Sequence, residues 1–366
     1  MAERVETVVI GAGQAGLSMS SHLTERGREH VVLEQGDVAE TWRTCRWDGF
    51  FLNTPNWSLQ LPGGHYDGPE PDAFGSLAEV IEYLDGYAET IDAPVRTRTK
   101  VTAVRRGAGG RLSVEAEGEA FDAANVVVST GAFQRPHVQA SASDLPGDVL
   151  QLTPNTYRRP AQLPDGAVLI VGSGQSGCQI ADELLRAGRT VYLSVGACPW
   201  LPRRYRGREV MHWLRDVGLL DQTVDTLPSL DARLTCNPPI SGNDGGHDCH
   251  PRWLAAGGVI LVGRLERIDG ARIRFGSNCD ESLAKGEEFV ANFRARASTN
   301  TSSRQGSTCP TSRSRRSRCP RPRAASSIFA STGSRPFSGR RDTGRTSPGS
   351  TCRRSTPPGG RSRSVV

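Results

Sequence analysis

Val5–Gln35, VETVVIGAGQAGLSMSSHLTERGREHVVLEQ, is the segment with the clearest structural signal in the sequence. Its β-branched run, Val8–Ile10, predicts a buried strand. A predicted amphipathic helix follows, and HVVLE then predicts a second strand. The turn between the first strand and the helix has the spacing G-x-G-x-x-G, with Gly11, Gly13 and Gly16. A strand, this turn, a helix and a second strand together are typical of a Rossmann-type dinucleotide site.

Each glycine of this turn has its own physical task. Gly11 makes the tight turn, Gly13 lets the backbone approach a pyrophosphate, and Gly16 lets the helix pack close to the strand. Free N–H groups at the start of the helix favour the phosphates. Glu34 ends the second strand, where a carboxylate accepts hydrogen bonds from a ribose diol. The unit therefore predicts a dinucleotide with a free ribose.

The same unit recurs in Gly166–Gly196, GAVLIVGSGQSGCQIADELLRAGRTVYLSVG. Its strand Val168–Val171 leads to three glycines with the same spacing: Gly172, Gly174 and Gly177. Ser194 stands where the first unit has an acidic residue, and RRYRGR follows at Arg203–Arg208. A serine with arginines nearby would accept a 2′-phosphate, which a glutamate would repel. We therefore expect NADPH here, the alternative being that the arginines form a solvated surface.

Two such units about 160 residues apart predict an α/β fold with two Rossmann-like dinucleotide-binding domains, of the three-layer ββα type known from FAD and NAD(P) binding. One domain would hold a flavin, and the other the nicotinamide that reduces it. Residues 95–106 and 110–128 predict a small antiparallel insertion. A buried strand, Asn125–Ser129, then leads into Thr130 and Gly131 near the cofactor.

Longer segments resemble one family, the NADPH-using, FAD-dependent flavin-containing monooxygenase-like oxidoreductases of bacteria. The matching pieces span residues 4–296 and are VVIGAGQAGLSMS, TWRTCRWDGFFLNTPNWSLQLPG, VVVSTGAFQRPHV, YRRPAQLPDGAVLIVGSGQSGCQIADEL and PRRYRGREVMHWL. The resemblance implies that NADPH reduces the flavin. The flavin then activates O2 as a C4a-(hydro)peroxyflavin that oxygenates a small organic substrate. An NADPH oxidase or flavin reductase that transfers no oxygen is the alternative.

The resemblance also implies the residues of the site. Asn53, in LNTP, would be catalytic, with its amide bonded to the flavin–oxygen adduct or to the nicotinamide; as an alternative it is a turn residue. The other residues assigned to cofactor binding are Gly11, Gly13, Gly16, Glu34, Gln35, Trp42, Arg43, Asn53, Thr54, Val101, Thr130, Gly131, Gly172, Gly174, Ser176, Gly177, Ser194, Arg203 and Arg204.

One departure concerns the linker before the second glycine loop. Relatives carry F-x-G and then H-S-x-x-Y, whereas this chain has LPGDVLQLTPNTYRRP. Leu145, Gly147 and Tyr157 fit that pattern, but Thr153 occupies the histidine position. The contact made by that histidine is therefore not expected here.

The composition changes sharply after residue 297. Residues 298–366 contain 15 Arg, no Lys and one acidic residue, a net charge of +14, whereas residues 1–297 carry 30 basic and 38 acidic residues.

The change in composition coincides with a possible change of reading frame. Ser307–Arg318 can be encoded by codons that, when read one base earlier, encode IDVPDEPEPEEP. Pro336–Thr351 can likewise be encoded by codons that encode VLWATGYRPDFSWVD when they are read in that same shifted frame. We hypothesise a one-base frame change between about Arg294 and Ser298.

These observations predict three segments. Residues 1–158 form an FAD-binding domain that lacks its closing C-terminal part, and residues 159–296 form an NADPH-binding domain inserted into it. Residues 297–366 form a disordered basic tail, because little apolar surface is available there to offset the cost of ordering the chain.

Other classes of function find little support in the sequence. No run of about 18 apolar residues predicts a membrane span, and the N-terminus reads as a first strand, so a cytoplasmic location is expected. HDCH, at His247–His250, lacks the further ligands of a metal site, and none is predicted. Nucleic-acid binding through the arginine-rich tail remains a remote alternative without a recognised binding fold. The substrate and the oligomeric state are not predicted.

Overall fold

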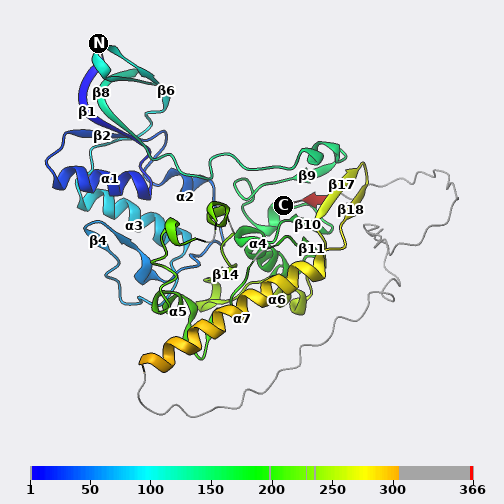
Figure 1. Ribbon diagram of the computed structural model, residues 1–366. Helices are drawn as coiled ribbons and strands as arrows, with labels where there is room; N and C mark the ends of the chain where they lie inside the picture. Colours follow the sequence, from blue (N-terminus) through cyan, green and yellow to red (C-terminus); the bar gives the residue numbers. More distant parts are fainter. Residues whose placement is uncertain (1, 198, 228, 235, 305–362, 366) are drawn as a thin grey trace, which may run out of the picture.

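A computed structural model of the protein describes residues 2–197, 199–227, 229–234, 236–304 and 363–365 (Figure 1). Its helices are α1 (Gln14–Glu25), α2 (Glu40–Thr44), α3 (Leu77–Thr90), α4 (Gln175–Arg186), α5 (Val210–Asp216), α6 (Pro251–Gly257) and α7 (Cys279–Arg304). The strands of the two large sheets are β1 (Glu3–Ile10), β2 (His30–Leu33), β5 (Val95–Arg96), β6 (Val101–Arg106), β7 (Leu112–Ala116), β8 (Glu119–Val128), β9 (Val149–Gln151), β10 (Val168–Val171), β11 (Val191–Ser194), β16 (Ile260–Val262) and β19 (Arg363–Val365). Four short hairpins pair β3 (Gln60–Leu61) with β4 (Gly64–His65), β12 (Arg204–Tyr205) with β13 (Arg208–Glu209), β14 (Ile240–Ser241) with β15 (His247–Asp248), and β17 (Leu265–Asp269) with β18 (Arg272–Phe275).

The first sheet has the strand order β5-β2-β1-β8-β7-β6. β1 runs parallel to β2 and to β8 from Phe121 to Val128, with Ile10 opposite Leu33 and Val128. The amino half of β8 runs antiparallel to β7, and β7 antiparallel to β6. This β6–β8 meander confirms the predicted antiparallel insertion. The predicted strand Asn125–Ser129 is the carboxyl part of β8, which ends at Val128.

We define the first lobe as β1–β8 with α1–α3. Its layers follow from the alternation of side chains along β1. Val9 points to a core that α1 and α3 complete with Leu17 and Leu84. Val8 and Ile10 point to the opposite face, where Phe121 of the meander covers them. Because side chains alternate along a strand, one apolar run serves both faces. The result is a helix layer, a parallel sheet and an antiparallel layer.

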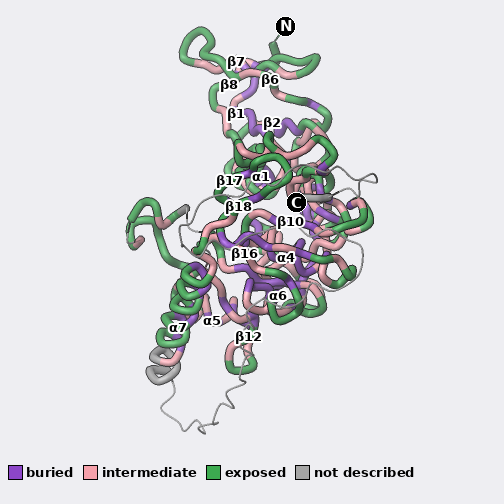
Figure 2. The backbone as a smooth tube through the Cα atoms, turned by 90° about the vertical axis from the view of Figure 1, so that its right-hand side faces the viewer, coloured by how far each residue is buried: buried purple, intermediate pink, exposed green. Residues whose placement is uncertain are grey.

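The second lobe, β9–β19 with α4–α7, repeats this plan. Its sheet has the order β16-β11-β10-β19-β9, and all of its pairs are parallel. Ile170 of β10 faces the core formed with α4 and α6, and Leu169 faces the β17–β18 hairpin. Figure 1 shows the two lobes side by side, and Figure 2 shows buried residues concentrated around β10, β16, α4 and α6. Two three-layer α/β lobes confirm the predicted fold class.

Two sequence-based limits differ from the elements of the structure. β9 pairs within the second sheet, although the predicted limit at residue 158 assigns it to the first domain. α7 runs through residue 296 to Arg304 and packs Phe293 and Ala297 against α5, so the helix does not end where the composition changes. Arg363–Val365 of the predicted disordered tail likewise form β19, between β10 and β9. Residues 305–362 and 366 of that tail lie outside the described residues. Within the described part of the chain, no helix has the length and apolarity needed to cross a membrane.

Candidate dinucleotide sites

The first glycine loop has the tight geometry that its sequence predicts. Gly11 has φ = +105°, and its N–H donates to the carbonyl of Leu33 at 2.7 Å. A Cβ on Gly16 would lie 1.8 Å from the carbonyl oxygen of Gly11, far inside van der Waals contact. Any side chain at Gly16 would therefore push α1 away from the end of β1.

Gly13 forms the N-cap of α1, and the space beside it is open. No side chain caps this helix, and a Cβ on Gly13 would meet no atom within 4 Å. The first N–H groups of α1 therefore lack a side-chain acceptor and face open space, as a helix that receives a phosphate requires. This loop fits the pyrophosphate of a dinucleotide.

Glu34 lies at the carboxyl end of β2 beside this loop. Its side chain is buried, with Oε2 accepting from the N–H of Ala12 at 2.7 Å and Oε1 from the N–H of Gly36 at 3.1 Å. Gln35 next to it is exposed. Val101 begins β6 two residues after Thr99, whose N–H donates to the carbonyl of Glu34 at 2.7 Å. The structure thus brings the predicted ribose carboxylate to the first glycine loop and Val101 to the same end of β2.

Thr130 and Gly131 lie on the other side of the first loop. The N–H of Ser129 donates to the carbonyl of Ile10 at 2.8 Å, and a Cβ on Gly11 would lie 2.6 Å from the carbonyl oxygen of Ser129. Gly131 has φ = +80°. The carboxyl ends of β1, β2 and β8 therefore meet around one loop, as in the ligand crevice of an open parallel sheet.

The second glycine loop has nearly the same backbone geometry as the first. Gly172 has φ = +109° and donates to the carbonyl of Ser194 at 3.1 Å, and a Cβ on Gly177 would lie 2.0 Å from the carbonyl oxygen of Gly172. Gly174 caps α4 without a side-chain acceptor, and the space beside it is open. Ser176 is the second residue of α4 and is partly exposed. This loop also fits a dinucleotide pyrophosphate.

The hydroxyl of Ser194 forms two hydrogen bonds within the protein. The side chain is buried, and its Oγ donates to the carbonyl of Gly263 at 3.0 Å and accepts from the N–H of Leu265 at 3.1 Å. A direct contact with a 2′-phosphate would have to replace one of these bonds. The structure therefore places Ser194 at the predicted end of β11 without leaving its hydroxyl free.

Arg203 is likewise not on an open surface. Its side chain is 1 % exposed, its Nη1 donates to the carbonyl of Asn53 at 2.6 Å, and its Nη2 lies 3.2 Å from Glu209 Oε1. The guanidinium carbon also lies 4.0 Å from the ring centre of Phe74. Burial lowers the pKa of Arg203 to about 10 and raises the pKa of Glu209, so for both groups the loss of solvent outweighs their mutual attraction.

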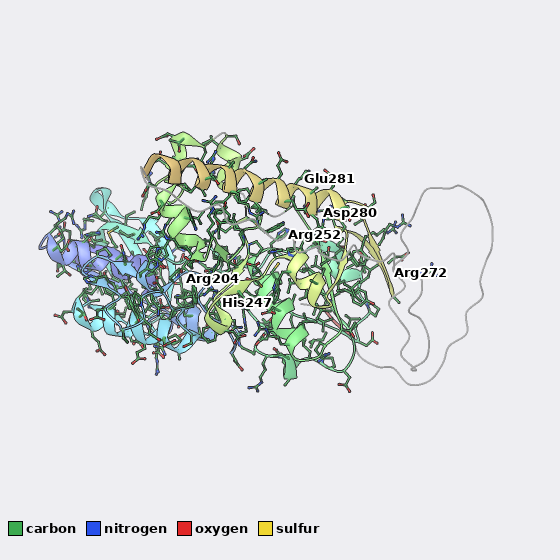
Figure 3. The ribbon with its side chains drawn as sticks, turned by 90° about the horizontal axis from the view of Figure 1, so that it is seen from below. Arg204, His247, Arg252, Arg272, Asp280 and Glu281 are labelled. Atoms are coloured by element: carbon green, nitrogen blue, oxygen red, sulfur yellow. The ribbon has the colours of Figure 1, made fainter. Side chains whose placement is uncertain are left out.

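Arg204 points elsewhere than its neighbour. Its Nη1 and Nη2 donate at 2.8 Å to the carbonyls of Gly246 and Gly245, next to His247 (Figure 3). His247 of the HDCH segment lies 2.9 Å from the buried carboxylate of Asp182, and His250 caps α6. Burial lowers the pKa of His250 to about 4. Among the described residues, no group of three or more His, Cys, Asp or Glu has an arrangement that could hold a metal.

The remaining predicted residues lie in α2 and in the segment that joins it to β3. Trp42 packs edge-on against Phe50 at 5.7 Å, and Arg43 pairs with Asp85 of α3 at 2.5 Å. Asn53 and Thr54 are partly exposed. Within the described part of the chain, the amide of Asn53 makes no hydrogen bond, whereas its carbonyl is held by Arg203. The backbone of this predicted catalytic residue is therefore fixed from the second lobe, and its side chain is free to act.

Sequence reasoning missed the partner of Tyr157. This tyrosine is fully buried, and its hydroxyl donates to Glu183 Oε2 of α4 at 2.7 Å. The neighbouring Arg158 donates from its N–H groups to the carbonyls of Thr44 and Arg46, and its own carbonyl accepts from the N–H of Asp48 at 2.8 Å. The linker thus ties α4 to the segment before Asn53. Tyr157 could be recognised from the sequence motif, but no local pattern predicts that Glu183, 26 positions later, accepts its hydrogen bond.

Two three-layer lobes with matched phosphate loops, one followed by an acidic residue and one not, are typical of oxidoreductases that use two dinucleotides. Comparison with known proteins agrees with this class. The family profile described as pyridine nucleotide-disulphide oxidoreductase matches residues 8–215, and the chain belongs to this family. It is an oxidoreductase of the flavin monooxygenase-like type.

Three similar proteins illustrate the relationship. The "Uncharacterized oxidoreductase CzcO-like" of Geobacillus kaustophilus is 32 % identical over 277 residues, covering 75 % of this chain and 76 % of its own. The indole-3-pyruvate monooxygenase YUCCA1 of Oryza sativa is 31 % identical over 308 residues, covering 79 % and 74 %. A solved mutant of the flavin monooxygenase from Stenotrophomonas maltophilia matches with a TM-score of 0.54 and 25 % identity, covering 75 % and 74 %.

Proposed function

We propose that the chain is an NADPH-dependent FAD monooxygenase acting on a small organic substrate. The observation that carries this proposal is the pair of matched glycine loops, of which only the first is followed by a carboxylate, Glu34. That carboxylate suits the free ribose of FAD, whereas the loop without one suits a phosphorylated ribose. The names of the monooxygenase relatives from rice and Stenotrophomonas agree with this assignment.

The residues of the first lobe would hold FAD. The open N-terminus of α1 at Gly13 would bind its pyrophosphate, and Glu34 would accept from its ribose hydroxyls. Thr130 and Gly131 would line the junction with the second lobe, where the N-terminus of α4 at Gly174 would bind the pyrophosphate of NADPH. A bound flavin would supply electron transfer from the nicotinamide and reaction with O2.

The protein's own groups would position the reactants and exclude water. Asn53 would donate a hydrogen bond from its amide to the nicotinamide or to the reacting oxygen. Its placement would depend on Arg203, which holds its carbonyl from the second lobe. We also propose the two domains at residues 1–158 and 159–296 as the units that carry the two cofactors.

An absorbance spectrum of the purified protein, before and after incubation with FAD, tests the first step. We expect flavin bands that remain after gel filtration and that bleach when NADPH is added under nitrogen. Glu34→Gln should retain less FAD, whereas Glu29→Gln, at an exposed glutamate just before β2, should retain as much as the unmodified protein. A protein that holds no flavin after this incubation, even when the reading frame after Arg294 is restored, would refute the proposal.

Comparing peroxide yield with NADPH consumption separates the proposed activity from that of an NADPH oxidase. A monooxygenase given a substrate releases less peroxide than the NADPH it consumes. If peroxide equals NADPH consumed with every substrate tried, among them thioethers, amines, ketones and 2-oxo acids, the oxidase alternative is correct.

A further inference from the structure

The two hydrogen bonds of Ser194 bracket one residue, Arg264. Ser194 Oγ donates to the carbonyl of Gly263 and accepts from the N–H of Leu265, the residues on either side of Arg264. A serine at this position therefore does not itself face a ligand. It fixes the turn between β16 and β17.

The same turn is fixed from its other side. The N–H of Arg264 donates to Asn278 Oδ1 at 2.9 Å, and its carbonyl accepts from the N–H of Gly276 at 2.8 Å. A Cβ on Gly263 would lie 1.8 Å from the carbonyl oxygen of Gly276, so the two backbones are in close contact. All backbone polar groups from the Gly263 carbonyl to the Leu265 N–H thus have partners, and the Arg264 side chain projects from a rigid support.

The guanidinium of Arg264 is available for a ligand. The residue is exposed, and within the part of the chain that the structure describes its side chain makes no hydrogen bond or ion pair. The two arginines that the resemblance assigns to cofactor binding differ in this respect. Arg203 is buried against Glu209, and Arg204 binds two backbone carbonyls of the second lobe.

Arg264 also lies at the edge of the sheet where a dinucleotide binds. β10, β11 and β16 are parallel, so their carboxyl ends share one edge. Hydrogen bonds connect these ends in sequence, from Gly172 to Ser194 and from Ser194 to the residues flanking Arg264. In this fold the adenosine ribose lies at the end of the second strand, and a nearby arginine can accommodate its 2′-phosphate.

We propose that Arg264 binds the 2′-phosphate of NADPH and makes the second loop prefer NADPH to NADH. This inference rests on the proposed NADPH site. The planar guanidinium offers the phosphate two parallel hydrogen bonds, and the fixed turn limits the entropy lost on binding. Ser194 acts as a positioning residue, through the backbone of the β16–β17 turn.

Binding of NADP⁺, NAD⁺ and 2′-AMP to the unmodified protein, Arg264→Gln, Arg264→Lys and Arg267→Gln tests the proposal by calorimetry. Arg267, on β17, is an exposed arginine three residues away and serves as the matched control. We expect Arg264→Gln to weaken binding of NADP⁺ and 2′-AMP by about 10-fold to 100-fold, the value of a charge-assisted hydrogen bond or two. Binding of NAD⁺ should change little, Arg264→Lys should retain part of the preference, and Arg267→Gln should bind like the unmodified protein.

The outcomes distinguish this inference from the proposed function. If the unmodified protein binds NADP⁺ and Arg264→Gln keeps the same ratio of NADP⁺ to NAD⁺ affinity, Arg264 is not the phosphate ligand and the NADPH site stands. If the unmodified protein binds neither nucleotide, the NADPH site and this inference are both refuted. Equal melting temperatures of Arg264→Gln and Arg267→Gln would show that a loss of affinity does not come from unfolding.

Discussion

In each glycine loop, one glycine permits close packing of the helix and another borders open space. Substitution of each by alanine distinguishes the two roles. Gly16→Ala would place a Cβ 1.8 Å from a carbonyl oxygen, whereas Gly13→Ala would place one in open space. We expect Gly16→Ala to lower the free energy of unfolding by at least about 1–3 kcal/mol, as overpacking does. Gly13→Ala should leave the unfolding free energy nearly unchanged and weaken FAD binding. Urea denaturation and FAD titration of both variants check this pair, and equal destabilisation by both would contradict it.

The hydrogen bond between Tyr157 and Glu183 predicts how the stability of the protein depends on pH. Burial raises the pKa of Glu183, and the Tyr157 hydroxyl opposes that shift by donating to the carboxylate. The folded carboxyl therefore keeps its proton to higher pH than the unfolded one, and the folded protein loses stability as pH rises from about 4.5 through the raised pKa. Tyr157→Phe removes the donor to the charged form, so its cost should grow in this pH range, to about 1–3 kcal/mol above it.

Unfolding of Tyr157→Phe should be measured by urea between pH 4 and pH 9, with Tyr66→Phe as the control. Within the described residues, the hydroxyl of Tyr66 makes no hydrogen bond. A cost of Tyr157→Phe that is the same at every pH would mean that Glu183 does not titrate in this range.

Among the elements, a buried arginine that is ion-paired within the second lobe also connects it to the first lobe. Arg203 precedes β12, Glu209 ends β13, and the Asn53 carbonyl that Arg203 holds belongs to the first lobe. Arg203→Met would leave the Glu209 carboxylate buried without its cation, which costs about 3–5 kcal/mol. Adding Glu209→Gln should recover most of that loss, because the remaining side-chain oxygen can still accept the N–H of Met211. Thermal unfolding of the single and double variants tests this, and a double variant less stable than Arg203→Met would contradict it.

The elements that the sequence predicted well are those with local signals. The strand Val168–Val171 has the predicted limits, because β-branched runs and glycine spacing depend only on neighbouring residues. The glycine loops were predictable for the same reason. Contacts across the chain were not. No local pattern shows that the hydroxyl of Ser194 is used by residues about 70 positions away, or that Arg203 contacts the Asn53 carbonyl 150 positions before it.

At the scale of the whole molecule, the first lobe has apolar surface at the end of its sheet. The segment Asn125–Val128 of β8 pairs with β1 on one side, and within the described residues no strand pairs with its other edge. Val128 is 69 % exposed and Phe133 is 75 % exposed, on either side of Thr130 and Gly131. Apolar side chains next to a cofactor site normally pack against protein or ligand. A segment encoded in the adjacent frame would have apolar surface to cover here, as the frame-change hypothesis requires.

Sequencing the coding DNA between the codons for Arg294 and Ser298 tests the frame change directly. We expect a gained or lost base, with the adjacent frame encoding the acidic linker and the ATGY segment. Codons that cannot encode them would refute the hypothesis.

If the frame has changed, the chain with the restored frame should bind FAD more tightly than the chain described here. The restored segment would add apolar residues that can cover Phe133 and the neighbouring edge of β8, and each large side chain that becomes buried contributes about 1.5–3 kcal/mol. Because this burial would stabilise only the folded first lobe, FAD would bind a larger folded population. Fluorescence titration with FAD should compare the restored chain, the present chain and a chain that ends at Arg304. Equal affinity of the restored and present chains would show that the residues after Arg304 do not contribute to the flavin site, in whichever frame they are read.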